Sequence, residues 1–131
     1  MMEEYRGAES ILVADDEPIV LSLARTVLLS YGYQVFLAKD GKEALDLHQQ
    51  TGHIDLLLTD VIMPAMTGPE LVHVLKQEVA DLRCIFMSGY DKDQIQKRGG
   101  EDVGCDFLRK PFTPRALLQK VRETLDAGKD A

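Results

Sequence analysis

The sequence predicts an α/β fold with a doubly wound, five-stranded parallel sheet in the strand order 2-1-3-4-5. Three observations lead to this prediction. Short β-rich runs alternate with amphipathic segments at intervals of roughly two dozen residues, as in repeated βα units. Several of these runs are continuously apolar, which is typical of parallel strands covered by helices on both faces. The 131 residues suffice for one domain with its own core.

The strand candidates are short apolar runs between the amphipathic segments. They cover residues 11–14, 34–38, 54–59, 84–88 and 106–109. The elements occupy residues 10–127, which we expect to form the domain. Residues 1–9 would then be an N-terminal extension and residues 128–131 a C-terminal tail.

The helix candidates are identified by apolar spacing and by their first residues. The first begins at Pro18 and carries apolar residues at i, i+3, i+4 and i+7 up to Tyr31. The others begin near residues 40–43, 67–70 and 113–114, each with a side chain suited to an N-cap. A fourth helix in chain order, over 91–98, is polar nearly all round and should be the least stable.

Composition excludes several functions. Fifteen Lys and Arg against 22 Asp and Glu give a formal charge of −7, the wrong sign for binding nucleic acid. No apolar run is long enough to cross a membrane and no signal peptide is recognisable, so we expect a cytoplasmic protein without membrane contact. Cys84 and Cys105 lie in apolar stretches without metal-ligand or CxxC spacing, which favours buried, reduced thiols.

Polar residues follow the strand candidates at the edge where such sheets bind ligands. Asp15 and Asp16 follow the first strand, Asp60 follows the third, Ser88 ends the fourth and Lys110 follows the fifth. Each residue taken singly is more often a turn, a cap or a solvated charge. Their convergence on one crevice indicates a functional site.

Three carboxylates in one crevice repel each other unless cations or protons are bound. Lys110 can supply one positive charge, and a divalent ion with oxygen ligands can supply the rest. Such a site suits Mg²⁺, with Mn²⁺ as a substitute, better than Zn²⁺. A carboxylate beside these cations can attack a phosphoryl group to form an aspartyl phosphate. No nucleotide-binding glycine loop is recognisable, so we expect the phosphoryl group to come from a protein or a small phosphodonor.

Four motifs of the sequence resemble those of the response regulator receiver family of two-component signalling, which has a flavodoxin-like fold. They are ILVADDEP at 11–18, LLTDVIMP at 57–64, FMSGY at 86–90 and FLRKPF at 107–112. The resemblance implies that Asp60 accepts phosphate from a phosphohistidine on a histidine kinase or a histidine phosphotransfer protein. It also implies that Asp16, Asp60 and the backbone carbonyl of Ile62 ligate Mg²⁺, with Asp15 acting through a metal-bound water.

The same resemblance implies a switch. Lys110 would pair with the phosphoryl oxygens, Ser88 would turn toward them, and Phe107 would swing inward. The face formed by the fourth helix, the fifth strand and the fifth helix would be remodelled, and the helix over 91–98 is the element that would move. A monomer, or a weak homodimer that phosphorylation favours, is expected.

Some positions depart from the family pattern. Ala65 stands where Gly is common, so the turn over 64–68 should be stiffer, and Phe107 replaces the common Tyr. Bulky residues at Ile62 and Tyr90, where side chains gate the attacking water, suggest slow dephosphorylation. Residues 6–13 and the MSGY run resemble receivers at the C-terminal end of hybrid sensor histidine kinases; a free-standing single-domain regulator is the alternative.

Two alternative functions compete with this assignment. A haloacid-dehalogenase-like phosphatase would need a second Asp two residues after the nucleophile, where this chain has Ile62. A receiver-like interaction module that never takes phosphate would not need the full set of polar residues. We therefore expect a phosphoacceptor signalling domain, not an enzyme. Ile19 and Leu23 lie off or at the margin of the buried stripe of the first helix, so we expect them to dock a kinase helical bundle.

Overall fold

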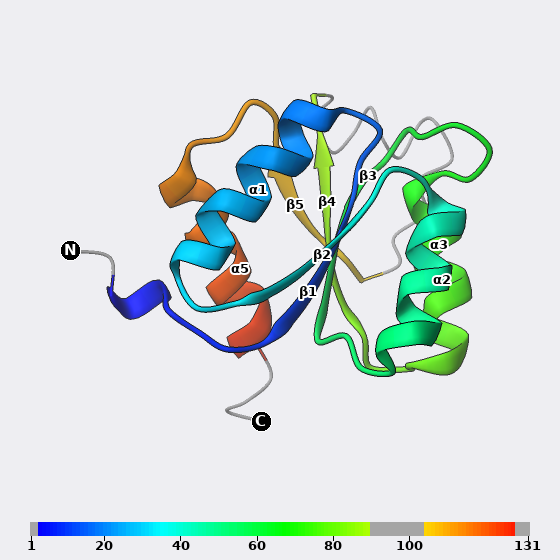
Figure 1. Ribbon diagram of the computed structural model, residues 1–131, viewed down its shortest axis with the longest axis horizontal. Coiled ribbons are helices and arrows are strands. Elements are labelled where there is room, and N and C mark those ends of the chain that lie inside the picture. The colour runs from blue at the N-terminus through cyan, green and yellow to red at the C-terminus, as the bar shows by residue number, and fades with distance from the viewer. Residues whose placement is uncertain (1–2, 90–103, 128–131) are drawn as a thin grey trace.

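The computed structural model describes residues 3–89 and 104–127, and their strands form one parallel sheet with helices on both faces (Figure 1). The strand order is β2-β1-β3-β4-β5, as predicted. In chain order the elements are η1 (Glu3–Tyr5), β1 (Ser10–Ala14), α1 (Pro18–Ser30), β2 (Gln34–Ala38), α2 (Gly41–Thr51), β3 (Leu56–Asp60), α3 (Gly68–Glu78), β4 (Arg83–Ser88), β5 (Asp106–Arg109) and α5 (Pro114–Asp126). Helices α1 and α5 cover one face of the sheet, and α2 and α3 cover the other (Figure 1).

The observed strands agree with the predicted ones within two residues at each end. β2 and β5 match the predicted ranges, and β1 and β4 each begin one residue earlier. β3 begins two residues later than predicted, and its last residue is Asp60. The predicted helix over 91–98 lies outside the described residues. No helix in the described ranges is long and apolar enough to cross a membrane.

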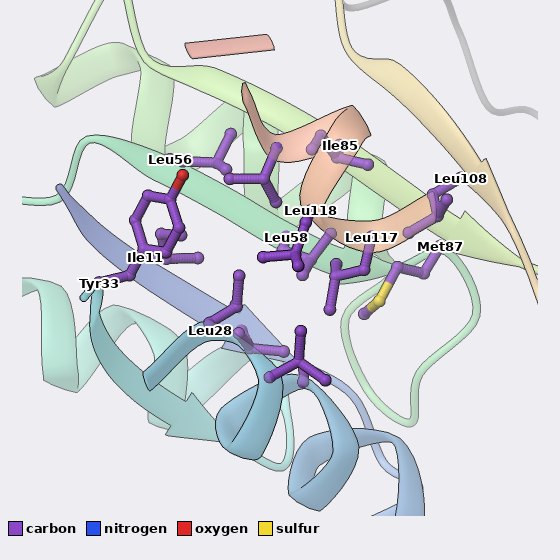
Figure 2. Close-up of a cluster of buried hydrophobic side chains, with 14 of the residues drawn as sticks. Ile11, Leu28, Tyr33, Leu56, Leu58, Ile85, Met87, Leu108, Leu117 and Leu118 are labelled. Atoms are coloured by element: carbon purple, nitrogen blue, oxygen red, sulfur yellow. The ribbon is translucent and has the colours of Figure 1, made fainter. Parts of the chain in front are cut away.

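Each face of the sheet packs against its own hydrophobic core. Because successive strand residues point to opposite faces, Ile11 and Val13 of β1 face α1 and α5, while Leu12 and Ala14 face α2 and α3. Figure 2 shows the first of these cores, in which side chains from four strands meet those of α1 and α5. Burial on both faces explains why the strands read as continuous apolar runs.

The helix starts are held as the sequence predicts. Thr67 accepts a hydrogen bond from the Glu70 backbone N–H, and the Glu70 carboxylate accepts one from Thr67 N–H, which completes a capping box. Asp40 accepts from Glu43 N–H at the start of α2, and Thr113 accepts from Ala116 N–H at the start of α5. These caps fix the loops that leave the carboxyl ends of the strands.

The expectation of reduced thiols is wrong, because Cys84 and Cys105 form a disulfide. Cys84 lies in β4 and Cys105 directly precedes β5. The register pairs Ile85 with Asp106, so the two cysteines occupy the next cross-strand position. Their Cα atoms are 4.7 Å apart, which is within the usual range for a disulfide. Sequence spacing alone could not reveal this register.

Residues 3–9 pack against the loop between α1 and β2 and against α5. The Tyr33 hydroxyl donates to the Tyr5 carbonyl oxygen, and Gly7 N–H donates to the Tyr31 carbonyl oxygen. Arg122 of α5 donates to both carboxylate oxygens of Glu9, at 3.0 and 2.8 Å. We call these contacts of residues 3–9 with Tyr31, Tyr33 and Arg122 the N-terminal clasp.

Candidate functional site

Three carboxylates meet at the carboxyl ends of β1 and β3. Asp15 and Asp16 follow β1, and Asp60 is the last residue of β3, the strand beside it. One carboxylate oxygen of each lies within 4.8 Å of the others. Asp15 is fully buried, Asp60 is 8% exposed and Asp16 is exposed. The sequence therefore predicted this cluster from the strand ends alone.

Backbone donors hold two of the carboxylates in place. Glu17 N–H donates to Asp15 Oδ1 at 2.9 Å, and Val61 N–H donates to Asp60 Oδ1 at 2.9 Å. Asp15 N–H in turn donates to the Ala38 carbonyl oxygen at the end of β2. The turn geometry after each strand thus orients the acidic groups, so that they need little further ordering to receive a ligand.

Lys110 brings a positive charge to the same point. It follows β5, and its ammonium lies 2.8 Å from Asp15 Oδ2 and 3.5 Å from Asp60 Oδ1. Lys110 N–H donates to the Ser88 carbonyl oxygen at 2.8 Å, and the Lys110–Pro111 peptide bond is cis. The ammonium therefore bridges the carboxylates that β1 and β3 contribute.

Burial and like charge change the acidity of the cluster. Burial raises the pKa of Asp60 to about 6, the charge of Asp15 adds to the shift, and Lys110 opposes it. Burial likewise raises the pKa of Asp15, against the interaction with Lys110. Burial lowers the pKa of Lys110, but its contacts with Asp15 and Asp60 outweigh that effect and leave this pKa above its ordinary value. One ammonium therefore does not fully compensate the buried negative charge.

The cluster has the donors that a hard divalent cation prefers. Asp15 Oδ2 is buried and accepts no well-aligned hydrogen bond, although Lys110 Nζ lies 2.8 Å away. The candidate ligands are carboxylate oxygens only, without nitrogen or sulfur. Such a donor set fits Mg²⁺ or Mn²⁺ better than Zn²⁺.

A cleft of about 750 Å³ opens over the cluster. Its polar lining includes Asp16, Asp60, Ser88 and Lys110. Its apolar lining includes three exposed side chains: Ile19 at 82%, Leu23 at 37% and Ile62 at 45% exposure. The cleft therefore joins the carboxylates to an apolar rim formed by α1 and the β3–α3 loop.

The structure brings some of the predicted site residues together and places others elsewhere. Asp15, Asp16, Asp60 and Lys110 form one cluster, and Ser88, 3% exposed, ends β4 on the same cleft. Phe107 is half-buried on β5 and packs against the core on the α2–α3 face. Tyr90 lies outside the described residues.

Two residues of the site were missed by the sequence analysis. Glu17 Oε1 lies 3.9 Å from the Lys110 ammonium, and the position of Glu17 directly after Asp16 was the available signal. Gly68 donates its N–H to the Val61 carbonyl oxygen at 2.8 Å, and a Cβ there would collide with the Asp60 carbonyl oxygen. Nothing in the motif Thr67–Glu70 pointed to this close approach.

Ala65 adopts a left-handed backbone conformation, with φ of 69°. Because Ala stands here where Gly is common in the family, the sequence predicts a stiffer turn over 64–68. The observed φ gives a physical reason, since a Cβ disfavours this region of backbone space. The loop that follows Asp60 is therefore strained at one residue.

Sequence comparisons connect this geometry to known proteins. The family model described as "Response regulator receiver domain" matches residues 11–122. Sensor kinase CckA of Brucella abortus is 36% identical over 94% of the chain, which covers 13% of that protein. Alkaline phosphatase synthesis transcriptional regulatory protein PhoP of Bacillus subtilis is 32% identical over 89% of the chain, covering 48% of that protein. The chain thus spans about half, or much less, of the length of these relatives.

Solved structures give the same picture. The chemotaxis protein CheY4 of Vibrio cholerae superposes with a TM-score of 0.82 at 29% identity, covering 90% of this chain and 99% of that one. The receiver domain of the hybrid histidine kinase CckA superposes with a TM-score of 0.75 at 36% identity, covering 88% of this chain and 98% of that one.

Proposed function

The chain belongs to the response regulator receiver family of two-component signalling modules, and on this premise we propose that Asp60 is its phosphoacceptor. One observation supports this assignment most strongly. The Asp60 carboxylate lines the cleft, within 4.8 Å of the Asp15 and Asp16 carboxylates and 3.5 Å from the Lys110 ammonium. Phosphoryl transfer needs chiefly such positioning and charge stabilisation.

In the proposed reaction an oxygen of Asp60 attacks the phosphorus of an N-phosphohistidine on a histidine kinase or a histidine phosphotransfer protein. The new O–P bond forms as the P–N bond breaks, and the departing imidazole takes a proton from solvent. Val61 N–H orients the attacking carboxylate, and the Lys110 ammonium stabilises charge on the phosphoryl oxygens. The product is an aspartyl phosphate.

Asp15, Asp16, Asp60 and the backbone carbonyl of Ile62 would hold a Mg²⁺ ion, for which Mn²⁺ can substitute. The ion would offset the negative charge that Lys110 leaves uncompensated and bind phosphoryl oxygens. The raised pKa of Asp60 supports this role, because a nearby cation would return Asp60 to the ionised form that attacks phosphorus.

A switch follows the transfer in this proposal. Ser88 turns toward the new phosphoryl oxygens, and Phe107 moves inward, which changes the face that includes β5 and α5. Ser88 lines the cleft at the end of β4, and Phe107 lies on β5, two positions before the residue that pairs with Ser88. The chain acts as a monomer or as a weak homodimer that phosphorylation favours, and Ile62 slows hydrolysis of the phosphate.

Intact-mass measurement with acetyl phosphate and Mg²⁺ tests the acceptor assignment. We expect one phosphoryl addition that is lost in alkali and does not occur in Asp60→Asn. Asp46→Asn, an exposed change on α2, is the matched control and should be phosphorylated normally. Undiminished phosphorylation of Asp60→Asn would overturn the assignment. If neither the wild-type protein nor Asp46→Asn is phosphorylated, the alternative of a receiver-like interaction module is favoured.

The apolar rim of the cleft is the proposed kinase-docking surface. Ile19 and Leu23 project from α1 beside the carboxylates, and Ile19 is 82% exposed although it is a large apolar residue. Such exposed apolar residues are typical of contact sites. A four-helix bundle carrying the phosphohistidine would cover them.

Replacement of Ile19 by Glu tests docking. We expect slower phosphotransfer from the cognate kinase and unchanged phosphorylation by acetyl phosphate. Leu29→Glu is the matched control, because Leu29 is 43% exposed on the same helix but does not line the cleft. Equal slowing of both reactions in Ile19→Glu would contradict the docking role.

The proposal also concerns the kind of protein to which this domain belongs. The similarity to sensor kinase CckA favours the receiver of a hybrid histidine kinase over a free-standing regulator. A haloacid-dehalogenase-like phosphatase gains no support, because Ile62 occupies the position where that class carries its second Asp.

A further inference from the structure

The disulfide lies away from the phosphoacceptor site. Cys84 is the second residue of β4 and Cys105 directly precedes β5, so the bond is near the amino ends of these strands, whereas the carboxylates are at the carboxyl ends. Among the described residues, β5 pairs only with β4 and forms one edge of the sheet. The disulfide is therefore a covalent link between the edge strand and its neighbour, and the phosphoryl chemistry does not use it.

The two sulfurs differ in access. Cys84 is 1% exposed, whereas Cys105 is half-buried in front of the edge strand. The ammonium of Lys76 lies close to the backbone of the residue before Cys105, 3.4 Å from where a Cβ of Gly104 would stand. Cys105 is therefore the more accessible of the two residues.

The link also lies next to the proposed switch residue. Phe107 pairs directly with Phe86, and the cysteines occupy the cross-strand position two residues earlier on the same face of the sheet. Side chains two residues apart on one strand face are neighbours. A covalent bond at this position therefore restricts the strand segment that carries Phe107.

We propose that Cys84 and Cys105 form a reversible thiol–disulfide exchange site, reduced by a low-molecular-weight or protein dithiol. In the oxidised form the disulfide holds the start of β5 against β4 and opposes movement of Phe107. In the reduced form β5 separates more readily and phosphorylation is favoured. The exchange site is inferred from the geometry of the disulfide, whereas its effect on phosphorylation rests on the proposed function.

The exchange is balanced in two steps. A thiolate of the dithiol attacks Cys105 Sγ, the protein disulfide breaks, and Cys84 leaves as a thiolate that takes a proton from solvent. The second thiolate of the dithiol attacks the dithiol sulfur of the mixed disulfide and releases Cys105 as a thiolate, which takes a proton from solvent. The protein gains two thiols as the dithiol becomes a cyclic or protein disulfide.

Thiol trapping tests the exchange site on the full chain. The protein is equilibrated under native conditions in mixtures of reduced and oxidised dithiothreitol, then alkylated and weighed intact. We expect a single two-electron transition from no alkylation to two alkylated cysteines. Alkylation of both cysteines in the fully oxidising buffer would overturn the proposal, as would a disulfide that is reduced only after the protein is denatured.

Amide hydrogen exchange tests the effect on the strand. Reduction should accelerate exchange in β5 at least about tenfold, because a closed loop of this length no longer restrains it. The double variant Cys84→Ala/Cys105→Ala should exchange like the reduced protein in either buffer. Equal exchange in the oxidised and reduced wild-type protein would overturn the restraint.

The coupling to phosphorylation is tested separately. With acetyl phosphate and Mg²⁺, the reduced protein should be phosphorylated at least about fivefold faster than the oxidised protein, the low end of typical coupling between sites. The double alanine variant should show the fast rate with and without dithiol. Equal rates would overturn the coupling. No phosphorylation in either state would instead contradict the acceptor role of Asp60, while the trapping result would still decide the exchange site.

Discussion

Charged groups at the two ends of the sheet differ in how well their charges and hydrogen bonds are paired. At the carboxyl ends, burial raises the pKa values of Asp15 and Asp60, and Asp15 Oδ2 lacks a well-aligned hydrogen bond. Near the amino ends of β4 and β5, the Arg83 guanidinium donates to three backbone carbonyl oxygens at the end of α5, and the Thr124 hydroxyl donates to Asp106.

The groups at the carboxyl ends are suited to binding a ligand, whereas those at the amino ends stabilise the fold. Groups whose polar atoms are fully paired contribute to stability and have little left with which to bind a ligand. Groups held in an unfavourable electrostatic state cost stability but gain from a bound cation or phosphoryl group. Substitutions at the two ends should therefore affect different quantities.

The largest expected effect is on the reaction rate at the carboxyl end. Replacement of Lys110 by Met removes the cation that faces Asp60, so phosphorylation by acetyl phosphate should slow by about 10²- to 10³-fold. The initial rate of phosphoryl incorporation measures this. Lys120→Met, which removes a half-exposed cation of α5 outside the cleft, should leave the rate unchanged. A loss of less than a few-fold in Lys110→Met would show that the ammonium does not stabilise the transferring group.

The next effect is on stability at the other end. Arg83→Met leaves the carbonyl oxygens of Thr124, Leu125 and Ala127 without this donor. The free energy of unfolding, measured in urea, should therefore fall by about 2 kcal/mol. The phosphorylation rate of the folded protein should not change. Slowing comparable to that of Lys110→Met would contradict the separation of the two ends.

A smaller effect follows from the raised pKa of Asp60. Its pKa is about 6 in the folded protein against an ordinary value of 3.8, so ionisation of Asp60 destabilises the metal-free fold. This cost is absent below about pH 4 and develops as the pH rises through 6. In chelator, Asp60→Asn should therefore raise the unfolding free energy by about 1 kcal/mol at pH 7.5, after allowance for solvent screening.

Urea unfolding at pH 4 and at pH 7.5 measures this difference. The gain from Asp60→Asn should disappear at the lower pH, and Asp46→Asn should show no gain at either. A gain that is the same at both pH values would mean that charge repulsion is not its cause.

The smallest effect is expected in the loop after Asp60. Ala65→Gly relieves a left-handed backbone conformation, so the unfolding free energy should rise by about 0.5 kcal/mol. Ala116→Gly in α5 is the contrasting control and should lower the unfolding free energy by about 1 kcal/mol. Destabilisation by Ala65→Gly would show that other contacts compensate the strain at this residue.

The parts of the molecule that depend on local pattern were predicted from the sequence. Apolar runs located the strands within two residues, and the strand ends located Asp15, Asp16, Asp60 and Lys110. These predictions succeed because burial on both sheet faces and the direction of parallel strands leave few alternatives.

The parts that depend on distant register were not predicted. Cys84 and Cys105 are 21 residues apart in sequence, and only the pairing of β4 with β5 makes them neighbours. The contact of Gly68 with the Asp60 backbone likewise depends on how the loop between them closes. Neither spacing nor composition carries this information.

The N-terminal clasp has a consequence for how this module can be joined to others. Tyr5 is bonded to Tyr33 in the loop after α1 and Glu9 to Arg122 of α5, and Figure 1 shows η1 away from the tip of β4. A polypeptide fused ahead of this segment would begin near the carboxyl end of α1, whereas the cleft lies at the amino end of that helix. Attachment to a larger assembly would thus leave Asp60, the proposed phosphoacceptor, open to a phosphodonor protein.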